Sequence, residues 1–238
     1  MLDWVPRSAT AIGVLAGPLI ILGYLAGSVP FAYLYSRRRL RRQLDHPGSD
    51  RVFAPEPGND ERLDVGYTVR TWGLPAVSTL AATTVAWHLT LAATPGANTF
   101  SAIGIFSNQA IGAWVSVALW TGLAAVVGHA APVWTGFRGG SGLPPAIALT
   151  AAYIPVVLLV AGGVGLVVYG LTRRPPLALV VALPAMVTFA YLAWLADLQA
   201  GWGVTNGPET TLWTMMMAAT VFARNLRAGQ DRPGSGSA

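Results

Sequence analysis

The chain has 238 residues, of which 53% are hydrophobic and 11% are charged, with 15 arginines, 10 acidic residues and neither lysine nor cysteine. A soluble domain carries about 25% charged residues. No charged residue occurs between Thr71 and Phe137, so the composition excludes a water-soluble fold and indicates an integral membrane protein. The missing cysteines exclude disulfides and thiolate catalysis, and the missing lysines exclude a Schiff base and a P-loop.

The first uncharged stretch runs from Ser8 to Ser36 and ends at a cluster of five arginines between Arg37 and Arg42. About 20 helical residues cross the hydrocarbon core of a bilayer, so this stretch predicts a first transmembrane helix. Arginines beside a span mark its cytoplasmic end, which puts the N-terminus outside. The segment that follows is rich in Pro, Gly and acidic residues, which is typical of a loop, and we expect a cytoplasmic loop at about 37–70.

The uncharged stretch 142–171 contains Pro155 and is followed by Arg173 and Arg174. A single crossing would place these arginines outside, so we expect a break near Tyr153 to Pro155 that makes two helices. The pattern predicts an all-α, polytopic integral membrane protein with seven transmembrane helices (six is the alternative), the N-terminus outside and the C-terminus cytoplasmic. We expect one domain at 1–230, a disordered tail at 231–238, and other spans at about 72–93, 110–127, 177–195 and 210–222.

Small residues recur at spacings that allow helices to approach closely in lipid. We expect these glycines to pack helices together rather than to support chemistry. They are Gly13, Gly17, Gly23, Gly27, Gly162, Gly163 and Gly165.

The stretch from Gly128 to Gly142 carries the strongest indication of chemistry. Its doubled glycine, its arginine and the helix expected to follow suit a phosphate oxyanion, because backbone amides at a helix N-terminus bind anions. Pro144 and Pro145 each remove a donor there, so the phosphate cradle is expected to be thin. His129 is suited to act as a base or as a phosphate donor, and a structural role in the returning loop is the alternative.

Other reaction classes lack their residues. No histidine is followed five positions later by aspartate, and no nucleophile elbow occurs. The His and acidic residues have no spacing for a metal, so we expect neither a metal nor a cofactor. The spans carry no acidic residue that would mark an ion pathway, which makes a transporter the weakest hypothesis.

Three segments resemble the motifs of one family. Residues 27–34 read GSVPFAYL, residues 128–142 read GHAAPVWTGFRGGSG, and residues 224–231 read RNLRAGQD. The first is similar to the GSIPF opening of the bacterial acyl-phosphate:glycerol-3-phosphate acyltransferases of the PlsY type. The second resembles that family's second motif in length and order, and the third is similar to a shortened form of its third motif.

The resemblance implies an enzyme of phospholipid biosynthesis in the bacterial inner membrane. Such enzymes transfer a fatty acyl group from acyl phosphate to glycerol 3-phosphate and form lysophosphatidic acid. Acyl phosphate is already activated, so the protein mainly holds two phosphates and positions a hydroxyl against a carbonyl. The implied partners are these two small substrates and the bilayer; no nucleic acid is expected.

Carried over by motif, the resemblance implies a catalytic set and a substrate-binding set. The family's loop lysine is Ser141 in this chain, and its third-motif histidine has no counterpart. These changes leave an alternative, a catalytically inactive PlsY-like membrane protein that binds lipid or a protein partner. The catalytic set is His129, Arg138 and Asn225, and the substrate-binding set is Ser28, Ser49, Arg70, Gly139, Gly140, Ser141 and Gly142.

Overall fold

The computed structural model describes residues 7–31, 72–93, 113–137, 139–198, 203–204 and 207–230. Within these ranges the chain is helical, apart from turns and a single bridge at Val204, and this confirms the all-α class. The elements are α1 (Arg7–Gly27), α4 (Leu74–Ala92), α5 (Ala113–Ala130), the short 3₁₀ helix η3 (Val133–Thr135), α6 (Leu143–Tyr153), α7 (Pro155–Thr172), α8 (Pro175–Leu195) and α9 (Pro208–Gln230).

The predicted break before Pro155 is present. Ile154 separates α6 from α7 with φ −141°, and Pro155 is the first residue of α7. Proline is favoured in the first helical turn, where its missing amide has no partner to lose. The helices at the two ends of the chain differ in length from the predicted segments. The helix α1 ends at Gly27, inside the uncharged stretch 8–36, and α9 continues beyond the span predicted at about 210–222 to Gln230.

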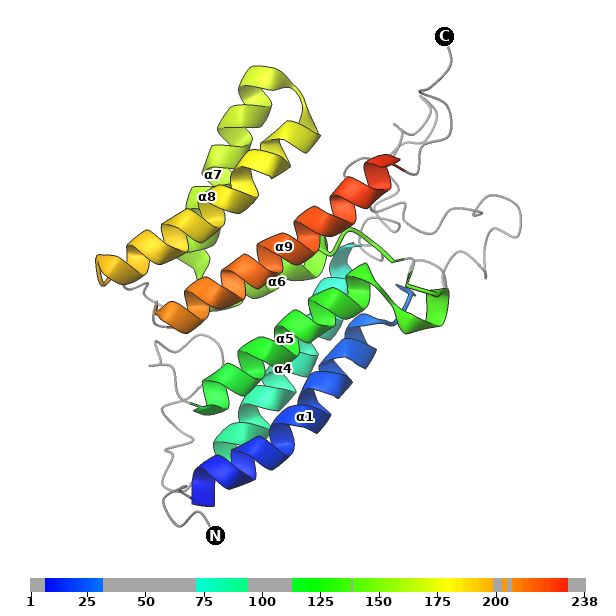
Figure 1. Ribbon diagram of the computed structural model, residues 1–238, viewed down its shortest axis with the longest axis vertical. Coiled ribbons are helices and arrows are strands. Elements are labelled where there is room, and N and C mark those ends of the chain that lie inside the picture. Colours follow the sequence, from blue (N-terminus) through cyan, green and yellow to red (C-terminus); the bar gives the residue numbers. More distant parts are fainter. Residues whose placement is uncertain are drawn as a thin grey trace.

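Two groups of helices make up the described structure (Figure 1). In one, α1 and α4 pack against α5, while α6 and α9 lie across the same bundle. In the other, α7 and α8 form a long hairpin that contacts α9 through α8. The loop between α5 and α6 lies next to the C-terminal end of α9, although the two segments are far apart in the sequence (Figure 1).

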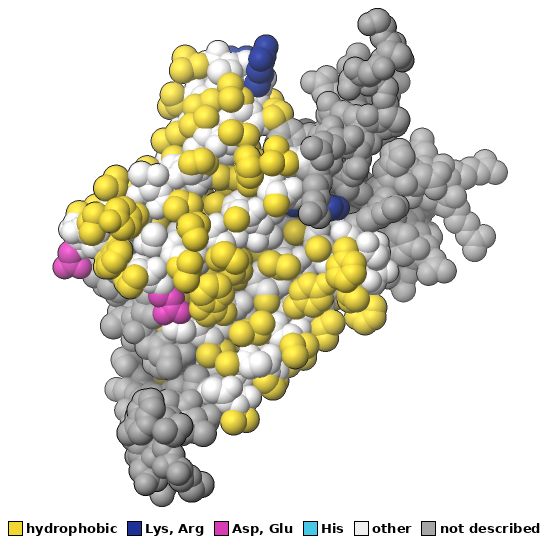
Figure 2. Space-filling view, viewed as in Figure 1, with side chains coloured by type: hydrophobic (Ala, Val, Ile, Leu, Met, Phe, Trp, Pro, Cys, Tyr) yellow, Lys and Arg dark blue, Asp and Glu magenta, His cyan; other side chains and the backbone are white. Residues whose placement is uncertain are grey.

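The surface of the described residues is that of a protein in lipid. Three segments are long and apolar enough to span a membrane: Val115–Thr135, Pro155–Thr172 and Pro175–Leu195. Leu159 and Leu166 on α7 are each 72% exposed, and an exposed apolar helix of this length indicates contact with lipid. Figure 2 shows hydrophobic side chains over most of the visible described surface, with basic groups toward the upper and right edges and acidic groups at the left.

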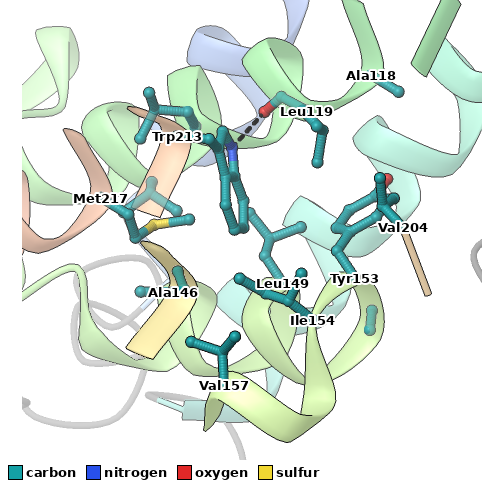
Figure 3. Close-up of a cluster of buried hydrophobic side chains, with 14 of the residues drawn as sticks. Ala118, Leu119, Ala146, Leu149, Tyr153, Ile154, Val157, Val204, Trp213 and Met217 are labelled. Atoms are coloured by element: carbon teal, nitrogen blue, oxygen red, sulfur yellow. Dashed lines mark hydrogen bonds between the residues drawn. The ribbon is translucent and has the colours of Figure 1, made fainter. Parts of the chain in front are cut away.

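A buried aromatic cluster joins α5, α6 and α9 (Figure 3). The Trp213 indole N–H donates to the Leu119 carbonyl at 2.8 Å, and the ring of Tyr153 meets the Trp213 ring edge-on at 6.2 Å. The Val204 amide donates to the Tyr153 carbonyl at 2.7 Å. Because a buried indole and its partner fix each other's position, this cluster holds α9 against the helices that carry the glycine loop.

Among the described residues, the predicted glycine contacts form most closely along α1 and α5, and Gly165 makes a looser one, with a Cβ there lying 3.2 Å from Ala182 Cβ on α8. A Cβ on Gly23 would lie 2.4 Å from the Thr121 carbonyl oxygen, and a Cβ on Gly27 would lie 1.9 Å from that of Ala125. The backbones of α1 and α5 thus touch in a way only glycine permits. The expectation was wrong for four other glycines, which have nothing within 4 Å of a Cβ: Gly13, Gly17, Gly162 and Gly163.

Candidate active site

The end of α5 turns back on itself and meets the glycine loop. His129 lies in the last turn of α5, and its carbonyl oxygen accepts the amide N–H of Gly140 at 3.0 Å. A Cβ on Gly139 would lie 2.2 Å from Pro132 Cδ and 2.4 Å from the His129 carbonyl oxygen. Glycine is therefore required at position 139 by close packing against the end of α5.

The backbone amides in the first turn of α6 are either absent or already hydrogen-bonded within the chain. Gly142 adopts φ +73°, a left-handed conformation that favours glycine, and the Leu143 amide donates to Ser141 Oγ at 3.2 Å. Pro144 and Pro145 have no amide N–H, and the Ala146 amide donates to the Gly142 carbonyl at 3.2 Å. Among the described residues, the first turn of α6 therefore offers no spare amide for an anion. The first turn of α6 would therefore not supply the amides of a phosphate cradle.

One cation beside this loop comes from α9. Arg224 donates from Nη2 to the Gly139 carbonyl at 2.7 Å and from Nε to the Gly140 carbonyl at 3.2 Å. Hydrogen bonds from a charged group contribute about 1.5–3 kcal/mol each, so Arg224 fixes the orientation of two successive peptide groups. Its positive charge lies against the loop that contains Ser141.

The next residue completes the attachment of the loop to α9. The Asn225 side-chain amide donates to the Val221 carbonyl at 2.7 Å and lies 3.4 Å from the Ser141 carbonyl. Both neighbours are acceptors, which settles that this atom is the nitrogen. The other amide atom, Oδ1, is buried and has no hydrogen-bond partner among the described residues. It is an acceptor in need of a donor, beside the glycine loop.

The end of α1 packs against the same turn. Ser28 is fully buried, and its hydroxyl donates to the Tyr24 carbonyl at 2.7 Å. The Tyr24 hydroxyl donates to the Ala131 carbonyl at 2.8 Å, just beyond α5. A Cβ on Gly128 would lie 3.0 Å from Ser28 Oγ, so Ser28 occupies the contact between α1 and α5.

The structure thus brings together most of the predicted site residues that it describes. The His129 carbonyl contacts Gly140, the Asn225 side chain contacts Ser141, and Ser28 lies at the adjoining helix end. Arg224 was missed as a site residue because the sequence offered no reason to separate it from the arginines that mark topology. Among the described residues no cluster of metal-ligating side chains occurs. Three predicted residues lie outside the described residues: Ser49, Arg70 and Arg138.

Comparison of the sequence with known proteins assigns the chain to a family. A family model described as glycerol-3-phosphate acyltransferase matches residues 68–229. The chain belongs to the glycerol-3-phosphate acyltransferase family. The matched region contains the glycine loop and Asn225, and it begins after Ser28 and Ser49.

Two bacterial relatives agree. The glycerol-3-phosphate acyltransferase of Anaeromyxobacter sp. (strain K) is 34% identical over 161 residues, covering 67% of this chain and 70% of the relative. That of Pseudomonas paraeruginosa is 31% identical over 176 residues, covering 74% and 79% of the two chains. These relatives support an enzyme and give no support to the inactive alternative.

The fold is also shared with a solved structure. PlsY (YgiH), an integral membrane glycerol 3-phosphate acyltransferase, superimposes in its glycerol 3-phosphate form with a TM-score of 0.58 and 23% identity over 90% of both chains. Its lysophosphatidic acid form gives the same TM-score at 21% identity. At this identity the likeness establishes a common fold, that of an integral membrane protein.

Proposed function

We propose that this acyltransferase transfers a fatty acyl group from acyl phosphate to glycerol 3-phosphate and releases lysophosphatidic acid and inorganic phosphate. The observation that carries the proposal is the glycine loop fixed between His129 on α5 and the Arg224–Asn225 pair on α9. Family membership supports the acceptor and the product. The donor is inferred from the chemistry, because a mixed anhydride needs no covalent nucleophile and the chain has no cysteine.

Both substrates carry a phosphate, and guanidinium groups are the donors best suited to it, since they offer paired N–H groups in a plane. Arg224 supplies one positive charge at the loop. We expect Arg70 and Arg138 to supply two more, with Ser49 and Ser28 as hydroxyl partners. The loop residues Gly139, Gly140, Ser141 and Gly142 then form the wall against which the phosphates bind.

The glycerol hydroxyl is oriented by Asn225. Its Oδ1 atom is a buried acceptor without a partner among the described residues, and a buried acceptor of this kind costs about 1–3 kcal/mol until a donor is supplied. A substrate hydroxyl is such a donor. Its binding would therefore satisfy Asn225 and place the hydroxyl oxygen beside the loop.

Acyl transfer forms one ester bond and breaks the acyl–phosphate bond. The 1-hydroxyl oxygen of glycerol 3-phosphate attacks the acyl carbonyl carbon, and the hydroxyl proton passes to the His129 imidazole. The new ester C–O bond forms, the bond between the carbonyl carbon and the phosphate oxygen breaks, and phosphate leaves with the electron pair. Arg138 and Arg224 would stabilise the negative charge on the leaving phosphate, and His129 returns the proton to it.

We further propose that the protein is a multi-pass protein of the bacterial inner membrane with seven spans, an external N-terminus and a cytoplasmic C-terminus. Arg224 and the α5–α6 loop lie at one end of the bundle, and Glu209 contacts the other end of α5 through Ser116. Arginines favour the cytoplasmic side. The phosphate site would therefore face the cytoplasm, where both phosphorylated substrates arise.

The direct test is synthesis of lysophosphatidic acid by the purified full-length protein in lipid nanodiscs. Labelled glycerol 3-phosphate is supplied with palmitoyl phosphate, palmitoyl-CoA or palmitoyl-acyl carrier protein, and the product is measured by mass spectrometry. We expect product from palmitoyl phosphate alone. Product from one of the thioesters and none from the phosphate would show that the proposed donor is wrong.

The role of His129 has a matched control. His129→Ala should lower the rate by about 10²–10⁴-fold, the usual contribution of an acid–base group. His88 is an exposed histidine on the outward face of α4, so His88→Ala should leave the rate within about twofold. Equal rates for the two variants would remove His129 from the reaction.

A further inference from the structure

Three apolar side chains are exposed on the turn between α5 and the glycine loop. Val133 is 41% exposed, Trp134 is 66% exposed and Phe137 is 61% exposed. They lie on η3 and just after it, and Figure 1 shows this green turn projecting beyond the ends of α1 and α5. Neighbouring apolar side chains that are exposed together mark a surface that contacts a partner or a membrane.

Phe137 is exposed although its backbone is strained. It adopts φ +63°, a left-handed conformation that is costly for a bulky residue and that glycine adopts freely. The residue before it, Gly136, has a similar conformation with φ +61°. Neither the backbone nor the limited burial of the ring favours phenylalanine at this position. The phenyl ring therefore gains its stabilisation from a contact outside the described chain.

The turn is fixed to the glycine loop through Pro132. The Pro132 carbonyl accepts the amide N–H of Thr135 at 3.3 Å and that of Phe137 at 2.9 Å, and it also accepts the Thr135 hydroxyl at 3.3 Å. The Pro132 ring packs on Gly139, where a Cβ would lie 2.2 Å from Pro132 Cδ. A contact that fixes the position of the turn would thus also fix the position of the glycine loop.

The length of α5 places the turn at the edge of the membrane. Ser116 donates to Glu209 at 2.7 Å, and this carboxylate marks the boundary opposite the glycine loop because charge is costly in hydrocarbon. From Ser116 to Ala130 the helix rises about 21 Å, whereas the hydrocarbon core is about 30 Å thick. The apolar segment continues through η3 to Thr135, so the turn lies where hydrocarbon meets the lipid headgroups.

We propose that Trp134 and Phe137 insert into the bilayer interface on the glycine-loop side and hold the glycine loop at that depth. Aromatic rings concentrate at this level of a membrane, because their apolar faces leave water there while polar groups remain hydrated. The partner of the turn is therefore the lipid of that leaflet. This inference goes beyond acyl transfer, since it assigns a lipid-binding surface to residues that have no role in the proposed reaction.

The depth of the turn can be measured because the chain has no cysteine, so a single introduced cysteine carries a nitroxide label without background. Labels at Trp134→Cys and Phe137→Cys are studied in the full-length protein in nanodiscs of phosphatidylcholine and phosphatidylglycerol. Leu166→Cys on the exposed face of α7 is the reference for lipid, and Arg174→Cys at the exposed turn before α8 is the reference for water.

Power-saturation electron paramagnetic resonance gives the ratio of collisions with oxygen, which concentrates in hydrocarbon, to collisions with a water-soluble nickel chelate. The ratio at positions 134 and 137 should exceed that at position 174 by about tenfold and lie below that at position 166. The physical reason is that interfacial groups reach about 5–10 Å into the boundary between headgroups and acyl chains.

Phe137→Gly separates the contribution of the ring from that of the backbone. Glycine relieves the strain at this position, so the turn should remain folded while its contact with lipid weakens. The ratio at the Trp134→Cys label should then fall by about threefold. The matched control is Trp194→Ala, which removes a partly exposed ring on α8 and should leave this ratio unchanged.

Three results would overturn the inference. A ratio at positions 134 and 137 equal to that at position 174 would place the turn in water. Low collision rates with both reagents would show that protein covers the rings, as in contact with a second copy of the chain. A ratio as high as that at position 166 would place the turn in the hydrocarbon core instead of the interface. None of these measurements depends on turnover, so the assay of lysophosphatidic acid tests the proposed function separately.

Discussion

The two groups of helices are built differently, and the α7–α8 hairpin is the more apolar of the two. In the site half (α1, α5, α6 and α9), Gly23 and Gly27 bring helix backbones into contact and polar side chains cross between helices. In the α7–α8 hairpin, Gly162 and Gly163 face open space, and only 17% of the α7 span and 22% of the α8 span is buried. Hydropathy identifies the hairpin helices as spans, but it does not reveal the close packing of the other group.

The difference lies in where each half finds its specificity. The hairpin needs only apolar surface, which lipid accepts in any orientation, whereas the site half relies on positions where a single atom changes the contact. The comparison predicts that matched substitutions should have large effects in the site half and small ones in the hairpin or on the outward faces. Four pairs test this.

Asn225 should give the largest effect. Asn225→Leu keeps the volume but removes the donor to the Ser141 and Val221 carbonyls and the acceptor for the substrate. Buried groups left without partners cost about 1–3 kcal/mol each, so formation of lysophosphatidic acid should fall by roughly 100-fold. Thr220→Val on the same helix removes a hydroxyl that donates to the Met216 carbonyl, and it should change the rate by less than about twofold. Similar losses in both variants would contradict the contrast.

Gly27 should give the next effect, on stability. A Cβ there would lie 1.9 Å from the Ala125 carbonyl oxygen, which belongs to backbone and cannot move aside. Overpacking costs about 1–3 kcal/mol, and we expect Gly27→Ala near the upper value, measured as a lower Tm in detergent. Gly163→Ala, at a position with open space, should leave the Tm unchanged or slightly higher. A wild-type Tm for Gly27→Ala would show that α1 and α5 are less closely packed.

Arg224 should give a smaller effect on the rate. Arg224→Ala removes two charge-assisted hydrogen bonds to the glycine loop, and a loss of about 10- to 100-fold is expected. Arg224→Lys keeps the charge but not the paired geometry, so its rate should be intermediate. Arg174→Ala, at an exposed site before α8, is the control and should be neutral. Equal losses for the alanine and lysine variants would assign the role to geometry rather than charge.

The smallest effect tests one motif in two settings. Ser141 Oγ accepts the amide of Leu143, and Thr172 Oγ1 accepts the amide of Arg174, in each case two residues onward. Ser141→Ala should lower the free energy of unfolding by about 1 kcal/mol because the site is buried. Thr172→Ala should lower it by less than about 0.5 kcal/mol, since water replaces the hydroxyl. Reversal of this order would contradict the comparison.

Much of the fold could be predicted because its signals are local. The break before α7 follows from Pro155, and the spans follow from runs of apolar residues. The glycine spacing was a weaker guide, because Gly13 and Gly17 have the same spacing as Gly23 and Gly27 and face open space. Which face of a helix meets a neighbour depends on the whole bundle, and no local pattern records it.

The site was predictable where a residue type suits phosphate chemistry, as with the doubled glycine, His129 and Asn225. The role of the backbone was not. The sequence predicted a thin cradle at the start of α6, because Pro144 and Pro145 have no amide N–H, but it did not show that the Leu143 amide donates to Ser141 or that the loop carbonyls face Arg224. Such pairings link residues 84 and 85 positions apart, and only the folded chain reveals them.

The hydrogen bonds from Arg224 on α9, the last helix to be synthesised, hold the glycine loop in place, and this has a consequence for biosynthesis. Gly139 and Gly140 leave the ribosome long before Arg224, so the nascent chain inserts most of its helices while the loop still lacks its hydrogen bonds to Arg224. Competence for transfer would arise only when translation is nearly complete and α9 docks. A chain truncated before α9 should reach the membrane and remain inert.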